Sequence, residues 1–107
     1  MTKVLFICTA NRERSPTAEH VFSTWSNIET DSAGIGNDAD VQLSTEQVDW
    51  ADTIFVMEKV HRSRLQTRFR AHLNGKRVIC LNIPDDYPLM DMELIELLKS
   101  KVGPYLR

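Results

Sequence analysis

The sequence predicts an α/β fold in which a parallel sheet carries helices on both faces. Strand and helix patterns alternate along the chain without a break, which is typical of parallel strands joined by helices. The first strand pattern, Val4 to Ile7, is apolar at every position, as expected for a strand buried on both faces. No linker, repeat or low-complexity segment interrupts the 107 residues, so we expect a single domain over residues 1–107.

The first half of the chain continues with a helix, a strand and a second helix. Pro16 suits the first turn of a helix whose apolar residues continue at helical spacing to Trp25. Residues 28–33 form a more polar strand pattern, which we expect at an edge of the sheet. Ser44 and Gln47 have the spacing of a capping box and predict the start of a short helix.

The middle of the chain adds a third strand and a third helix. Residues 53–57 predict a third strand, apolar along most of its length. Residues 58–69 predict a helix, and we expect its side chains Val60, Leu65 and Phe69 to point inward.

The last third of the chain adds a strand, a loop and a helix. Residues 77–81 predict a fourth strand, and the prolines of segment 84–89 exclude a helix there. Asp91 or Met92 opens the last helix. We expect that helix to end before the Gly103–Pro104 pair, because proline disrupts a helix interior.

The composition limits the functions to consider. The net charge of −2 gives no general reason to expect nucleic-acid binding, and the longest apolar run, Val4 to Cys8, is far too short to span a membrane. Two cysteines do not make a disulfide framework, which favours a cytoplasmic protein with free thiols. No CxxC, HExxH or His-rich tract occurs, so we expect neither a metal nor any other cofactor.

The charges are unevenly distributed along the chain. Residues 59–77 contain seven Lys or Arg and no acid, whereas residues 85–96 contain five acids and no base. The basic stretch is either a solvated helix face or a surface that steers an anionic substrate or partner. The sequence leaves both interpretations open.

Cys8 and Arg14 enclose the segment that carries the chemistry. A loop that leads from a strand into a helix offers unpaired N–H groups and the positive end of the helix dipole to an anion. Arg14 adds a planar fork that fits two phosphate oxygens, and the same field favours a thiolate at Cys8. Ser15 can donate its hydroxyl to the sulfur. Cysteine at a strand end is often only a packing residue, but the strand–loop–helix context favours a catalytic role.

The segment "CTANRERSPTAE", residues 8–19, resembles the phosphate-binding loop C-x-G-N-x-C-R-S-P-x-A-E of the low-molecular-weight protein tyrosine phosphatase family. "DSAG", "LSTEQVDWADTIFVMEKVHRSRL" and "IPDDYP" resemble later family segments, the last of them a D-P-aromatic loop. The chain resembles more closely a shorter predicted-phosphatase branch of the same superfamily. The resemblance implies a three-layer sandwich with strand order 2-1-3-4.

The resemblance also implies an activity and its partners. The expected enzyme is a metal-independent hydrolase, a protein tyrosine phosphatase that cleaves phosphotyrosine or a related aryl phosphate through a phosphocysteine intermediate. Its substrate would be a phosphorylated protein or a small aryl phosphate, and inorganic phosphate or vanadate would inhibit it. We expect a monomer that binds neither nucleic acid nor membrane.

Matched residue by residue, the resemblance implies a role for four residues of the loop. Cys8 is the nucleophile that takes the phosphoryl group, and Arg14 binds the phosphate oxygens and stabilises the transition state. Asn11 holds a left-handed turn that most residues other than glycine resist. Ser15 is the hydrogen-bond partner of the thiolate.

The general acid is expected from the D-P-aromatic loop. Aligning Tyr87 with the aromatic residue of that loop makes Asp85 the acid, whereas counting back from the following proline favours Asp86. We expect Asp85. The other expected phosphate- or substrate-binding residues are Thr9, Ala10, Arg12, Glu13, Asp86 and Tyr87.

Three departures from the family pattern affect the expected site. The loop glycine is replaced by Ala10, and the second loop cysteine by Glu13, which would oppose an incoming dianion if it pointed inward. The chain is also shorter than typical members, mostly within residues 34–43, a region that usually supplies one wall of the aromatic pocket. Specificity for phosphotyrosine is the property that these departures affect most.

Other reactive or aromatic residues are expected to be structural. Cys80 is expected to be a packing residue of the fourth strand. With strand order 2-1-3-4, the first and fourth strands lie two strand spacings apart, roughly 9–10 Å. A disulfide between Cys8 and Cys80 is therefore not expected, because its Cα atoms must lie within about 7 Å. His20, His61 and His72 are expected at the surface, and Trp25 and Trp50 in the core. Tyr87 could serve either as a pocket wall or as a packing residue.

Three other functions compete with the phosphatase. A phosphoryl-carrier protein of the sugar phosphotransferase B-component type also has a cysteine after its first strand, but it needs neither Arg14 nor an acid loop. An arsenate reductase of this fold needs further cysteines, and Cys80 is poorly placed for a redox relay. A non-catalytic phosphoprotein-binding module would agree with Glu13 and with the shortened segment 34–43.

Overall fold

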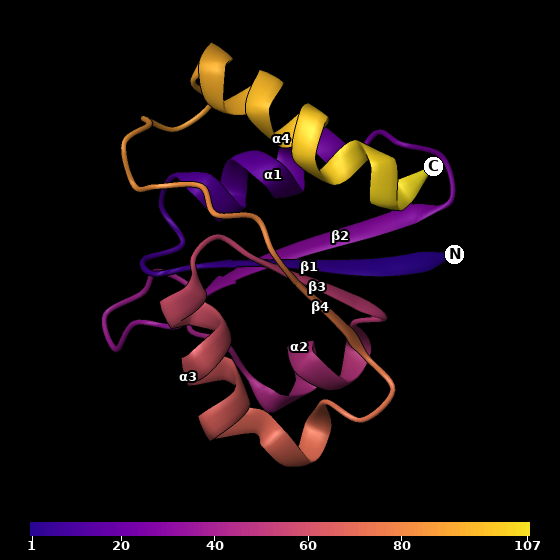
Figure 1. Ribbon diagram of the computed structural model, residues 1–107, viewed down its shortest axis with the longest axis vertical. Helices are drawn as coiled ribbons and strands as arrows, with labels where there is room; N and C mark the ends of the chain where they lie inside the picture. The colour runs from indigo at the N-terminus through magenta and orange to yellow at the C-terminus, as the bar shows by residue number, and fades with distance from the viewer.

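The structure, a computed structural model that describes residues 1–107, contains four parallel strands between two layers of helices (Figure 1). The elements in chain order are β1 (Thr2–Cys8), α1 (Arg14–Phe22), β2 (Ile28–Gly34), α2 (Thr45–Trp50), β3 (Thr53–Val56), α3 (Lys59–Phe69), the 3₁₀ turn η1 (Arg70–His72), β4 (Arg77–Cys80) and α4 (Met92–Leu106). The strand order is β2-β1-β3-β4, and every neighbouring pair is parallel. The α/β fold, the strand order and the edge position of β2 are thereby confirmed.

The all-apolar pattern of β1 follows from its central place in the sheet. Alternate side chains of a strand point to opposite faces. Val4, Phe6 and Cys8 therefore join the core under α1 and α4, whereas Leu5 and Ile7 join the core over α2 and α3. The strand separates two hydrophobic cores, and each needs an apolar residue at every second position.

The capping box at the start of α2 is present as predicted. The Gln47 N–H donates to the Ser44 hydroxyl at 3.2 Å, and the Ser44 N–H donates to the Gln47 side-chain oxygen at 3.1 Å. These two bonds satisfy donors that the first turn of a helix leaves unpaired.

Helix α4 extends beyond the predicted end, through Pro104 to Leu106. Tertiary packing holds its last turn: the Tyr105 ring lies 5.8 Å from that of Phe55, and Leu106 packs against the core. Gly103 is buried, and a Cβ there would lie 3.4 Å from the Trp25 ring. Because Pro104 falls in the final turn, it disturbs only a short stretch of helix.

The predicted inward face of α3 was wrong at one position. Val60 is 49% exposed, whereas Leu65 and Phe69 are buried as expected. His61, four residues before Leu65, takes the inward position in the first turn. A helix that begins at Lys59 places residues 61, 65 and 69 on one face, because residues four apart lie above one another.

Helix α1 is shorter than the predicted helix. Helix α1 ends at Phe22, and Trp25 lies beyond it, half-buried, with its ring 4.9 Å from that of Phe22. Trp50, also half-buried, packs against the core that lies over α2 and α3.

None of the helices has the length and apolar character needed to cross a bilayer.

Candidate active site

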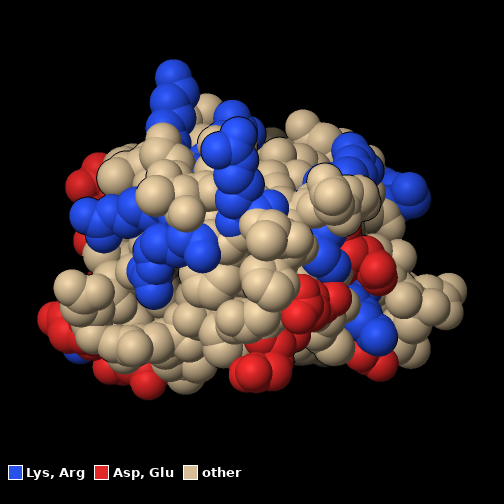
Figure 2. Space-filling view, turned by 90° about the horizontal axis from the view of Figure 1, so that it is seen from below, with Lys and Arg blue, Asp and Glu red and all other residues tan.

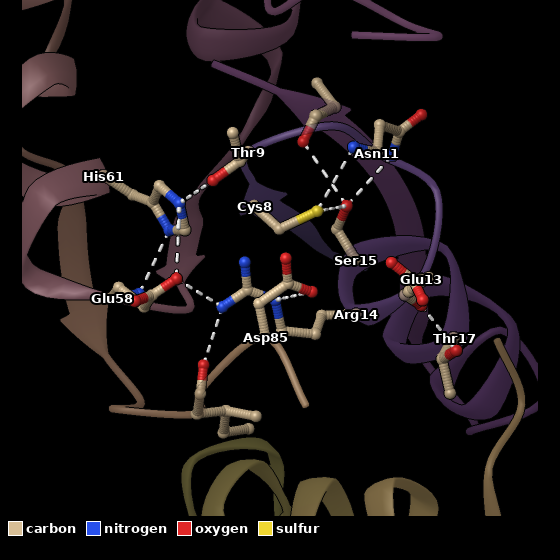
Figure 3. Close-up of polar contacts among 12 residues, drawn as sticks. Cys8, Thr9, Asn11, Glu13, Arg14, Ser15, Thr17, Glu58, His61 and Asp85 are labelled. Carbon is tan, nitrogen blue, oxygen red and sulfur yellow. Dashed lines mark hydrogen bonds and ion pairs between the residues drawn. The ribbon is translucent and has the colours of Figure 1, made fainter. Parts of the chain in front are cut away.

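Residues 8–14, which we call the catalytic loop after the role expected for them from the sequence, leave β1 at the end of the sheet where the carboxyl ends of the parallel strands lie. Cys8 is the last residue of β1 and is 3% exposed. Its Sγ lies 2.9 Å from the Ser15 Oγ and accepts a hydrogen bond from the Asn11 N–H at 3.3 Å (Figure 3). The Ser15 hydroxyl and the Asn11 N–H are thus both within hydrogen-bond distance of the sulfur.

Asn11 gives the loop its curvature. Its φ of 56° is the left-handed conformation that the family resemblance implied, and asparagine tolerates it better than most residues. The Asn11 side-chain amide donates to the Ser15 and Ser32 hydroxyl oxygens, each at 3.0 Å. Ser15 accepts from Asn11, and its own hydroxyl hydrogen has two acceptors in reach, the Cys8 sulfur at 2.9 Å and the Ala33 carbonyl at 3.4 Å.

The end of β2 lies directly against the catalytic loop. The Ile35 N–H donates to the Cys8 carbonyl and the Gly36 N–H to the Thr9 carbonyl, both at 2.9 Å. A Cβ on Gly34 would lie 2.6 Å from the Thr9 oxygen, which is too close for any side chain. The glycine of the "DSAG" motif therefore allows the loop to sit against β2.

Arg14 is held firmly from one side. It is 2% exposed, and its Nη1 donates to the Glu58 carboxylate at 2.6 Å and to the Ile83 carbonyl at 2.7 Å. On another edge of the guanidinium, its Nε lies 3.8 Å from the Asp85 carboxylate. With one nitrogen anchored by two acceptors, the remaining donors are fixed in orientation toward the space beside Cys8.

A small cavity of about 20 Å³ lies between these groups. Its lining residues are Cys8, Ala10, Arg12, Glu13, Arg14 and Asp85. A volume of this size holds about one water molecule, so a phosphoryl group needs more room. The Asp85 side chain is 62% exposed, and it can move away from Arg14 at little cost when an anion enters.

His61 contradicts the prediction of a surface histidine. It is 1% exposed, and its Nδ1 accepts from the Glu58 N–H at 3.1 Å. The Nε2 must then carry the proton, and it donates to the Thr9 Oγ1 at 2.8 Å. Burial, and then the positive charge of Arg14, lower the pKa of His61 to about 4, so the ring is neutral near pH 7.

Glu58 and His61 together form a support for the catalytic loop that the sequence analysis missed. Glu58 orients Arg14 through its carboxylate, and His61 holds Thr9 through its ring. Both residues follow directly after β3, whose end lies beside the end of β1. The sequence feature that could have indicated this support is the spacing of Glu58 and His61 at the predicted helix start. That spacing is typical of a capping box, in which both side chains bond to the backbone.

The comparisons with known proteins agree with this geometry. Residues 3–48 match the family model described as low molecular weight phosphotyrosine protein phosphatase. These residues include all of β1 except Thr2, the catalytic loop, α1 and β2. Over these residues, the resemblance to the low molecular weight phosphatase family is confirmed.

Several solved structures share the fold over nearly the whole chain. The YwlE arginine phosphatase from Geobacillus stearothermophilus is 21% identical with a TM-score of 0.78, covering 99% of this chain and 93% of that one. Wzb from Vibrio vulnificus, in complex with benzylphosphonate, is 23% identical with a TM-score of 0.79, covering 97% and 96%. SP-PTP from Streptococcus pyogenes, a low molecular weight protein tyrosine phosphatase, is 18% identical with a TM-score of 0.78, covering 99% and 91%. No curated protein sequence matches the chain.

Residues 34–43, the segment in which we expect the chain to be shortened, pack onto the catalytic loop. The Asp40 N–H donates to the Ala10 carbonyl at 3.0 Å. The Arg12 Nε lies 3.1 Å from the Asp40 carboxylate, and its Nη2 donates to the Asp38 carbonyl. The hydrogen bond and charge of Asp40 raise the pKa of Arg12. Arg12 thus lines the cavity, while its guanidinium is bonded to Asp40 and to the Asp38 carbonyl in residues 34–43.

The residues of the expected acid loop take different positions in the structure, and only one of them lies at the cavity. Asp85 reaches the cavity, whereas Asp86 is exposed and makes no hydrogen bond or ion pair there. Tyr87 packs against the core beside α4, in a shallow hollow with Met92 and Leu97. The Met90 N–H donates to the Thr17 Oγ1, which anchors the end of the loop to α1. Of the two uses left open for Tyr87, packing is the one that these contacts favour.

The remaining candidates lie away from the cavity. Cys80 is a free thiol, partly buried against the core that lies over α2 and α3, and its Sγ donates to the Asn82 side-chain oxygen at 3.4 Å. Strand β3 separates it from Cys8 in the sheet. His72 pairs with Asp49, and His20 is exposed. The structure contains no group of three or more His, Cys, Asp or Glu that could hold a metal ion.

The buried neutral His61 predicts a pH dependence of folding. The folded protein keeps His61 neutral down to about pH 4, whereas the unfolded chain binds that proton near pH 6.5. Between these values unfolding takes up a proton, so stability falls as the pH falls through this window, by up to about 3 kcal/mol in total. Glu58, Arg14, Arg64 and Asp85 are the charged groups that influence the ring.

The measurement is urea unfolding of the wild type and of His61→Gln between pH 4 and 7.5. Glutamine does not titrate in this range but can both accept and donate a hydrogen bond. We expect the loss of stability toward pH 4 to be smaller in His61→Gln than in the wild type. Equal pH slopes in the two proteins would contradict the assigned neutral state.

Proposed function

We propose that the protein is a cysteine-dependent phosphomonoesterase that hydrolyses phosphotyrosine or a related aryl phosphate through a phosphocysteine intermediate. The observation that carries the proposal is the convergence of Cys8, Arg14 and Asp85 on one cavity at the ends of parallel strands. In open α/β sheets, ligands bind at this edge. The match of residues 3–48 to the phosphatase family supports the same conclusion.

The first chemical step transfers the phosphoryl group to sulfur. The Cys8 thiolate attacks phosphorus, and the bond between phosphorus and the ester oxygen breaks. Asp85 gives its proton to the departing oxygen, which leaves as a neutral alcohol or phenol. Arg14 stabilises the charge on the phosphoryl oxygens, because its anchored guanidinium does not need to reorient as the charge develops.

The second step returns the enzyme to its starting state. Asp85, now a carboxylate, removes a proton from a water molecule that attacks phosphorus, and the phosphorus–sulfur bond breaks. Inorganic phosphate leaves and the Cys8 thiolate is restored. Ser15 and the Asn11 N–H are within hydrogen-bond distance of the sulfur and stabilise it as a leaving group.

A second candidate substrate is N-phosphoarginine, and Glu13 favours it. The printed name of one structural neighbour describes it as an arginine phosphatase. In this chain the carboxylates of Glu13 and Asp85 both line the cavity. The Glu13 carboxylate would attract a cationic guanidinium leaving group, whereas a neutral phenol ring gains nothing from Glu13.

The experiment compares phosphate release from p-nitrophenyl phosphate, phosphotyrosine and N-phosphoarginine, with and without EDTA. We expect multiple turnovers that EDTA does not affect and that vanadate inhibits, and no activity in Cys8→Ser. A phosphoryl-carrier protein would stop after one equivalent without its acceptor. A binding module would release no phosphate. Either of those two results would contradict the proposed function.

A further inference from the structure

The outward face of α3 and η1 carries a concentration of basic side chains. They are Lys59, Arg62, Arg64, Arg68 and Arg70, and only Arg62 among them is half-buried rather than exposed. Figure 2 views the protein from the side on which α2 and α3 lie in Figure 1, and Lys and Arg side chains spread over the upper part of that face. We call these five residues the α3 basic face.

The charges of the α3 basic face are not neutralised within the protein. Lys59, Arg62, Arg64 and Arg70 form no ion pair, and their side chains make no hydrogen bond. Arg68 donates to the Ile35 carbonyl at 2.8 Å, which is not a charged partner. In a chain with a net charge of −2, this face is a local excess of positive charge. Such an excess attracts anions from solution and accelerates their association.

Two neighbouring hollows shape the same face. The first has a volume of about 500 Å³ and is lined by Ile35, Asn37, Ser63, Arg64, Thr67 and Arg68. The second has a volume of about 690 Å³ and is lined by Ser63, Gln66, Thr67, Arg70 and Leu73. Each combines guanidinium donors with hydroxyl and amide groups, which suits carboxylate oxygens. Since Ser63 and Thr67 line both hollows, the two lie side by side along the helix.

The first hollow is connected to the catalytic loop by direct bonds. Ile35, which lines it, donates its N–H to the Cys8 carbonyl at 2.9 Å. From the other side, His61 on α3 donates to the Thr9 hydroxyl at 2.8 Å. An extended segment bound along α3 would therefore lie beside the catalytic loop, where the phosphorylated residue must enter.

We propose that the α3 basic face docks an acidic segment of the phosphorylated protein substrate next to the phosphate-binding cavity. The inference rests on the proposed phosphatase function and specifies the class of its substrate. A polypeptide fits better than a nucleic acid, because the hollows contain no aromatic side chain on which a base could stack. The only aromatic residue of α3, Phe69, is buried in the core.

The test uses two phosphotyrosine peptides that differ only in their flanking residues, glutamate in one and glutamine in the other. We expect the wild type to show a kcat/KM about tenfold higher for the acidic peptide at low ionic strength, and a smaller preference at high ionic strength. The double variant Arg64→Glu/Arg70→Glu, with one change in each hollow, should lose the preference. Its activity on p-nitrophenyl phosphate should be unchanged, since neither residue lies at the cavity.

The matched control is Lys99→Glu, an exposed charge reversal on α4, in the opposite helix layer. It should keep the wild-type preference, which separates docking from a general effect of net charge. A wild type that hydrolyses p-nitrophenyl phosphate but treats the two peptides alike would overturn the docking proposal and leave the proposed function standing.

Fluorescence anisotropy of the same peptides with Cys8→Ser tests docking when turnover is absent. Weaker binding of the acidic peptide after the Arg64→Glu/Arg70→Glu change would support docking even if the proposed function failed. A single-stranded oligonucleotide of equal charge serves as the third ligand. If the change weakens only oligonucleotide binding, the face binds nucleic acid and the docking proposal is wrong.

Discussion

Replacing Arg14 by lysine should lower kcat by about 10²–10³-fold while the protein remains folded. Arg14 meets two protein acceptors, Glu58 and the Ile83 carbonyl, through a single nitrogen and still directs other donors into the cavity. A lysine ammonium is a point charge and cannot satisfy these acceptors and hold two phosphoryl oxygens in a fixed plane. The loss should appear mainly in kcat, because the missing interaction is strongest in the transition state.

Arg12→Lys is the matched control for this prediction. The Arg12 side chain is paired with Asp40 and the Asp38 carbonyl at the outside of the loop, so this change should have little effect on kcat. Circular dichroism and urea unfolding of both variants check that the fold survives. Equal losses of activity in Arg12→Lys and Arg14→Lys would mean that the two arginines have been assigned the wrong roles.

Replacing Asp85 by asparagine should slow hydrolysis by about 10²–10⁴-fold, and the loss should depend on the leaving group. Asparagine keeps the shape of the side chain but has no proton to transfer. Phosphotyrosine needs protonation of its leaving oxygen, whereas p-nitrophenol is acidic enough to depart with little help. Asp85→Asn should therefore impair phosphotyrosine hydrolysis far more than p-nitrophenyl phosphate hydrolysis.

Asp86→Asn is the control, because Asp86 has the same chemistry and lies one residue from the cavity-lining Asp85. We expect close to wild-type rates for this variant on both substrates. A small and uniform loss in both aspartate variants would show that neither is the acid.

Much of the fold could be predicted because it depends on local patterns. The all-apolar β1 indicates a strand buried on both faces, and the Ser44–Gln47 capping box depends only on residues three apart. The end of α4 could not be predicted in the same way. Its last turn depends on contacts of Gly103 with Trp25 and of Tyr105 with Phe55, which are far apart in the sequence.

In the candidate site, too, contacts within one continuous segment could be predicted, whereas contacts between distant segments could not. Cys8, Asn11 and Arg14 belong to one continuous loop, so their spacing was enough to predict their proximity. Glu58 and His61 reach that loop only because β3 lies next to β1 in the sheet. A basic surrounding sequence made His61 resemble a surface residue, although its place in the first turn of α3 turns it inward.

The most direct test of the account is to trap the covalent intermediate. The wild type is mixed with excess p-nitrophenyl phosphate, quenched in acid during turnover and digested, and the peptides are examined by mass spectrometry. We expect one phosphoryl group on the peptide that contains Cys8 and none on the peptide that contains Cys80. Continued turnover with an unmodified Cys8 peptide, or a phosphoryl group on another residue, would contradict a mechanism in which the Cys8 sulfur takes the phosphoryl group.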